Sequence, residues 1–157
     1  MITHNGKNKF LGRKNNLDKN LYLEAEYASI IVCLLEKPYC VKSITKLLFL
    51  SLGIKYAVLS KYKNRKMDFI EVFLTPLGIK LMAHPEDLEA ILKVIALLER
   101  GKWISIEGDL INVERTLPKV KIKNKFLEKI KSYDVNPIEI VNNLEMKSFL
   151  EEVLQYV

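Results

Sequence analysis

The sequence predicts a mainly α-helical, winged-helix-like single domain with one small β-hairpin and extra helices at its C-terminal end. Apolar residues recur at the three- and four-residue spacing of amphipathic helices along most of the chain. The spacing changes to two between residues 103 and 113, which is the pattern of a strand pair. With 157 residues, of which 49% are hydrophobic, the chain is long enough for one domain with a sizeable core.

Residues 1–20 form a polar, basic segment. Asp18 is the only acid there, among the basic residues Lys7, Lys9, Arg13, Lys14 and Lys19. Such a segment buries too little apolar surface to offset the entropy that it loses on ordering. We therefore expect a flexible basic arm.

The next two elements are predicted helices joined by a tight turn. Apolar residues repeat at helical spacing from Leu21 until Pro38 ends the run. Ser43 is a suitable cap for a second apolar helix that stops at Gly53. This pair has the length of a DNA-reading helix-turn-helix, but its second helix is nearly all apolar. A recognition helix needs exposed polar side chains, so core packing is favoured over base readout.

The rest of the chain continues with helices around the hairpin. His84-Pro85 begins a helix that Arg100-Gly101 closes, and Trp103 is expected to anchor the hairpin 103–113 on the core. Amphipathic stretches follow at 119–133, 136–141 and 145–156. We divide the chain into the arm 1–20, a winged-helix-like core 21–115, and a C-terminal helical extension 116–157 of the same domain.

Composition restricts the partners and the compartment. Lys and Arg number 25 against 19 Asp and Glu, and the net charge of +6 favours an acidic partner, although a solvated lysine-rich surface explains it equally well. Cys33 and Cys40 are too few for a disulfide framework and fit no zinc pattern. No stretch resembles a secretory signal or a membrane span, so we expect a cytoplasmic protein.

We expect neither an enzyme nor a cofactor-binding protein, because no motif brings together a base, a nucleophile or a set of metal ligands. His84 reads as a helix-cap or surface residue rather than a catalyst. A small nuclease would need acidic metal ligands that converge. We interpret the acids as helix starts and surface charge instead, namely Asp68, Glu71, Glu86, Asp87 and Glu89.

Basic clusters and the C-terminal helix are the candidate binding sites. Besides the arm, two basic clusters suit phosphate contacts without sequence readout, and tyrosines in the first could stack on bases. The candidate nucleic-acid-binding residues are Lys55, Lys61, Tyr62, Lys63, Arg65, Lys66, Lys119, Lys121, Lys123 and Lys125. The apolar stripe of the last helix either closes the domain or docks on a partner, which gives the partner-binding candidates Phe149, Leu150, Val153 and Leu154.

Several runs of residues carry a family resemblance. They are Glu26-Tyr27-Ala28 with Ile31 and Leu34-Leu35, the stretch from Cys40 to Leu50, Tyr62, Arg65 and Asp68 with Phe73-Leu74, Leu97-Leu98, and the hairpin from Ile104 to Ile111. On these residues the chain resembles the small middle component of bacterial ABC-three-component antiphage systems of the Lamassu type, and the resemblance covers roughly residues 21–113. No catalytic motif is part of the resemblance.

The resemblance implies a non-catalytic, winged-helix-like adaptor subunit. Such a subunit bridges an SMC-like ATPase and an effector, commonly a nuclease, in an antiphage or anti-plasmid defence complex. The basic clusters would then help to hold DNA against the assembly. The alternative is an autonomous winged-helix regulator, which should dimerise and select a palindromic site. The apolar second helix argues against that alternative.

Overall fold

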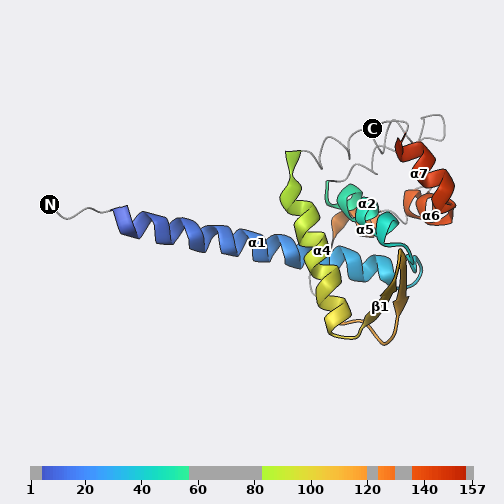
Figure 1. Cartoon of the computed structure of the whole chain (residues 1–157), viewed down its shortest axis with the longest axis horizontal. Helices are drawn as coiled ribbons and strands as arrows, with labels where there is room; N and C mark the ends of the chain where they lie inside the picture. Colours follow the sequence, from blue (N-terminus) through green and yellow to red (C-terminus); the bar gives the residue numbers. More distant parts are fainter. Residues whose placement is uncertain (1–4, 57–82, 120–123, 130–135, 155–157) are drawn as a thin grey trace.

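The fold is mainly α-helical with one two-stranded antiparallel hairpin, as the sequence predicted (Figure 1). It was obtained as a computed structural model. The structure describes residues 5–56, 83–119, 124–129 and 136–154. No helix in these ranges is long and apolar enough to cross a membrane.

Helix α1, Asn5–Leu35, begins much earlier than predicted. Residues 5–20, expected as a flexible arm, continue the helix and extend away from the other described elements (Figure 1). The physical reason is that helix propagation costs far less than nucleation. A helix already packed at its C-terminal end can lengthen through lysine, arginine and leucine, although the asparagines of the segment are weak helix formers. The helix ends before Pro38, as predicted.

Helix α2, Ile44–Lys55, packs on α1 and is capped as predicted, with the Ser43 hydroxyl accepting from the backbone N–H of Lys46 at 3.2 Å. The predicted stop at Gly53 is wrong. Gly53 lies buried inside the helix, which continues because Ile54 in the next position is itself buried in the core. Seven residues of this helix are buried, which confirms the predicted core packing.

The hairpin consists of β1, Ile104–Glu107, and β2, Leu110–Val113. Glu107 pairs with Leu110 across the turn, where Gly108 adopts the left-handed φ of 61°. The hairpin is tied to the start of α2 through an antiparallel bridge between Ser43 and Leu110. Asp109 accepts hydrogen bonds from the Ser43 hydroxyl and from the backbone N–H of Thr45, so the hairpin lies against α2 like a wing.

Helix α4, Pro85–Arg100, crosses α1 and ends at Gly101, as predicted. Gly101 is required there by the Trp103 ring, which a Cβ at this position would overlap. Trp103 is half-buried against the core, as its predicted anchoring role requires.

Replacing Gly101 by alanine should therefore destabilise the domain. Relieving the overlap requires the indole to shift, at a cost of about 1–3 kcal/mol. Because Trp103 is the single tryptophan, its fluorescence follows unfolding in a urea titration, which measures the lost free energy of unfolding. Lys93→Ala on the exposed face of the same helix is the control, and an equally small effect for both variants would contradict the prediction.

The C-terminal helices close the domain. They are α5, Lys125–Lys129, α6, Pro137–Asn143, and α7, Met146–Leu154. The ammonium of Lys46, a buried residue of α2, donates to the carbonyl oxygens of Asn142 and Leu144 at the end of α6. Those carbonyls have no partner within their helix, so Lys46 fixes α6 on α2.

The hydrophobic core lies where α1, α2, α4, α6 and α7 meet, and the hairpin adds a side chain from each strand. Among the described residues, its largest fully buried side chains are Tyr27, Phe149, Ile30, Ile31, Leu34, Leu47, Leu50, Leu52 and Ile54. The α1 members all come from its C-terminal part.

Candidate functional site

An apolar groove lies where α1 passes α4 and the base of the hairpin. It has a volume of about 270 Å³, and Glu24 is its single charged lining residue. The remaining lining residues are Leu21, Ala25, Ala28, Val94, Leu97, Leu98 and Trp103. Leu21 is 62% exposed and Leu97 54% exposed, whereas Leu98 is buried, so the groove reaches from the core to solvent. We call it the α1–α4 groove.

At one end of the groove, contacts with Arg115 hold the Trp103 ring in position. The guanidinium of Arg115 lies 4.5 Å from the centre of the indole ring, within the range of a cation–π contact. The same guanidinium donates to the carbonyl oxygen of Gly101. The indole therefore presents a preformed apolar surface.

The surface next to the groove is acidic. Glu24, Glu86 and Glu89 line an adjacent hollow between α1 and α4, together with Lys93. The Lys93 ammonium lies 3.3 Å from a Glu89 carboxylate oxygen and 3.6 Å from one of Glu24, and these contacts raise the pKa of Lys93. Lys93 pairs with two of these carboxylates, and the third, that of Glu86, lies 3.3 Å from His84 Nδ1. The three carboxylates outnumber the one lysine that lines the hollow, so its net charge is negative.

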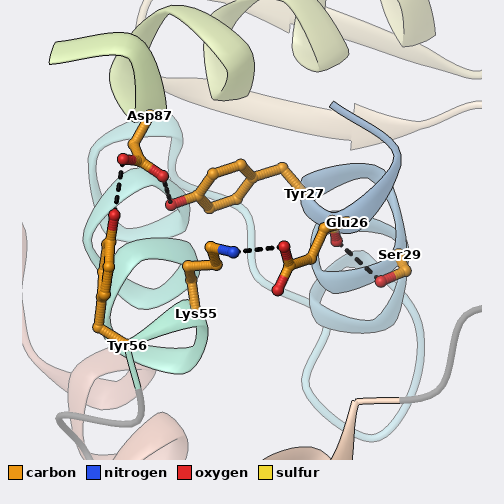
Figure 2. A network of polar contacts seen from close by, with 6 residues as sticks. All are labelled: Glu26, Tyr27, Ser29, Lys55, Tyr56 and Asp87. Atoms are coloured by element: carbon orange, nitrogen blue, oxygen red, sulfur yellow. Dashed lines mark hydrogen bonds and ion pairs between the residues drawn. The ribbon is translucent and has the colours of Figure 1, made fainter. Parts of the chain in front are cut away.

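A buried polar network fixes the helices that form the groove (Figure 2). The Asp87 carboxylate, 2% exposed at the start of α4, accepts hydrogen bonds from the hydroxyls of Tyr27 on α1 and Tyr56 after α2, each at 2.7 Å. Burial and the bonds to Asp87 raise the pKa of both tyrosines well above the ordinary value. Lys55 and Glu26 form an ion pair beside them.

Among the described residues, one group of side chains has the spacing of metal ligands, but the polar network gives it a structural role. Ligand atoms of His84, Glu86 and Asp87 lie within 4.8 Å of one another. Both Asp87 oxygens, however, already accept tyrosine hydroxyls. His84 occupies the N-cap position of α4, as predicted, and its ring stacks on Tyr56 with centroids 5.7 Å apart.

The predicted nucleic-acid-binding residues do not form one described cluster. Lys119 and Lys125 are exposed, while Lys55 is half-buried in its ion pair with Glu26 and so is not an exposed phosphate contact. The others lie outside the described residues: Lys61, Tyr62, Lys63, Arg65, Lys66, Lys121 and Lys123. The basic residues of the first segment, in contrast, belong to α1.

The predicted docking stripe of the last helix needs a correction. Phe149 is 1% exposed and packs edge-on against Phe49, with ring centroids 5.5 Å apart, so it closes the domain and is not available to a partner. Leu150 is 41% exposed and stays a candidate contact. The side chains of Val153 and Leu154 lie outside the described set.

The α1–α4 groove was not predicted, because Leu21, Ala25 and Ala28 share the helical spacing of the core residues of the first helix. A signal was present in the run Leu21-Tyr22-Leu23, since three consecutive apolar residues cannot all face one core. Tyr22 is in fact 67% exposed.

No family model, curated protein or solved structure matches this chain.

Proposed function

We propose that this chain is a non-catalytic, cytoplasmic adaptor that joins protein partners to DNA. The expected partners, taken from the family resemblance, are an SMC-like ATPase and an effector with nuclease activity in an antiphage defence complex. DNA contact is non-sequence-specific, and no cofactor takes part.

The observation that carries the proposal is the charge distribution of α1. Its first part, residues 5–19, holds five basic residues and Asp18, while residues 20–35 hold only Glu24 and Glu26 as charged residues. We call these parts the basic half and the acidic half of α1. The basic half extends from the body (Figure 1). A single helix fits the major groove of DNA, and lysine and arginine on it release counterions from the phosphates.

The α1–α4 groove supports the protein-binding side of the proposal. A preformed apolar groove beside a polar rim is a typical receptor for an amphipathic helix. Its position at the root of the basic half would bring a bound protein close to DNA held by that half.

The alternative is an autonomous winged-helix regulator. The wing-like contact of the hairpin with α2 favours it. The burial of α2 disfavours it, because that helix offers few side chains to base edges. A regulator would bind one duplex sequence in strong preference to random DNA, whereas the adaptor would bind both alike.

A test of DNA binding compares three full-length variants, each with four basic residues changed to glutamine. The first changes Lys7, Lys9, Arg13 and Lys14 in α1, and the second changes Lys61, Lys63, Arg65 and Lys66 in the predicted basic cluster. The charge-matched control changes Lys37, Lys42, Arg100 and Lys102, which are all exposed. Fluorescence anisotropy with a labelled random duplex is recorded over a range of salt concentrations.

We expect the α1 variant to lose at least about tenfold in affinity, with a salt slope shallower by up to about three to four. The control should lose much less, because its residues are spread over the body. Equal losses in the α1 variant and the control would mean that only net charge matters and would refute a role for the basic half. A loss confined to the second variant would move the contact to residues 61–66.

A further inference from the structure

We propose that the α1–α4 groove binds a second copy of this chain, with the two α1 helices crossing antiparallel so that the basic half of each covers the acidic half and groove of the other. This inference goes beyond the proposed function, since self-association needs neither DNA nor another protein. A partner protein that uses the α1–α4 groove would compete with the second copy for it.

The first step is that the backbone of the basic half of α1 extends away from the other described elements (Figure 1). Among the described α1 side chains, Leu23 is the first that packs against the core. The helix before it, residues 5–22, has 18 residues and a length of about 27 Å, and its five asparagines and two glycines are weak helix formers. Packing against another surface would stabilise it.

The second step is the apolar surface at the junction between the basic half of α1 and the body of the domain. Leu21 and Tyr22 are more than 60% exposed at the point where α1 leaves the body. Leu21 also lines the groove, which continues across Ala25 and Ala28 toward Leu97. Small residues on a helix let another helix approach closely, so this side of α1 suits helix–helix packing.

The third step is charge, which selects the occupant and its direction. The groove and its rim carry Glu24, Glu86 and Glu89. Among the described residues that line the two hollows, Lys93 is the only basic one. A helix with basic residues complements this surface, and the chain supplies one in residues 5–19. Antiparallel crossing brings each basic half onto an acidic half, and it also opposes the two helix dipoles favourably. Parallel crossing would place the five basic residues of one copy against the same five of the other, which would repel each other.

The pairing is compatible with DNA contact. Each basic half holds five basic residues and one acid, whereas each acidic half holds two acids, so both crossings keep a net positive charge. Two basic clusters would then lie along one paired helix.

Sedimentation equilibrium of the full chain, without DNA and up to about 100 µM, tests the proposal. We expect a monomer–dimer equilibrium that weakens with added salt. Leu21→Glu with Leu97→Glu should raise the dissociation constant at least about tenfold, because both side chains are largely exposed in the monomer and would be buried in the dimer. Leu92→Glu on α4 is the control, because Leu92 is also exposed and lines neither hollow, and it should leave the dissociation constant unchanged.

A charge exchange tests the direction of the pair. Arg13→Glu with Lys14→Glu, and separately Glu86→Lys with Glu89→Lys, should each weaken self-association. An equimolar mixture of the two variant proteins should form a heterodimer in which both crossings are attractive, one with the original charges and one with the charges exchanged. Far-UV circular dichroism establishes that each variant is folded.

Three outcomes would overturn the inference. They are a monomer at every concentration, a dimer that the Leu21 and Leu97 changes leave intact, and association only after duplex DNA is added, which would make DNA the occupant. DNA binding by a monomer would leave the adaptor proposal standing while excluding the dimer. A dimer without DNA affinity would support the self-association proposal while excluding the adaptor proposal.

Discussion

Replacing Asp87 by alanine is expected to lower the free energy of unfolding by about 2–5 kcal/mol. The change leaves the hydroxyl of Tyr27, a fully buried residue, without its acceptor and removes the acceptor of Tyr56 as well. It also removes a carboxylate from the first turn of α4, where the helix dipole favours negative charge. Urea unfolding followed by circular dichroism measures the loss.

The matched control is Glu89→Ala, which removes a carboxylate from an exposed position of the same helix. Its effect should stay within about 0.5 kcal/mol. If the two variants unfold at the same urea concentration, the network does not hold α1, α2 and α4 together as we describe.

The same network predicts a loss of stability at alkaline pH. Burial and the bond to Asp87 raise the pKa of Tyr27, so the folded protein keeps this proton at pH values where the unfolded chain, with a pKa near about 10, releases it. The stabilisation is therefore complete below pH 10 and is lost as the pH rises above it, by up to about 1.4 kcal/mol per pH unit. Tyr27→Phe should show a shallower decline above pH 10 than the unmodified protein. Parallel declines would argue against the assignment.

Local signals in the sequence were sufficient for most helix ends and for the hairpin. Ser43 caps α2 through its own side chain, Pro85 starts α4, and Gly108 supplies the left-handed turn residue. Each of these depends on a few neighbouring residues, which a sequence displays directly. The fold class followed from the change of spacing at the hairpin.

Features that depend on distant residues were not predictable in this way. Tyr27 and Asp87 are sixty positions apart, and nothing in either neighbourhood indicates that they meet. Gly53 has the local character of a helix stop, yet its burial in α2 is decided by contacts of the whole core. The α1–α4 groove arises for the same reason, since it exists only where two helices and the hairpin base come together.

Replacing Phe149 by alanine should destabilise the domain by about 3–5 kcal/mol, the cost of a cavity left by a fully buried aromatic ring. The ring contacts Phe49 of α2 edge-on, and α6 beside it buries Ile138 and Val141 completely. The cavity would open between α2 and the C-terminal helices, where Lys46 provides the polar half of the attachment.

Leu150→Ala is the matched control for Phe149, because it shortens the neighbouring apolar side chain on the exposed side of α7. Its effect on unfolding should be below about 1 kcal/mol, since exposed substitutions away from special features cost little. Thermal or urea denaturation of the isolated full chain distinguishes two roles for α7, which are closing the domain and docking on a partner. If α7 closes the domain, Phe149→Ala acts on the protein alone. If instead both variants leave stability unchanged and weaken only the binding of a partner, the helix is a docking element and the packing that we describe is wrong.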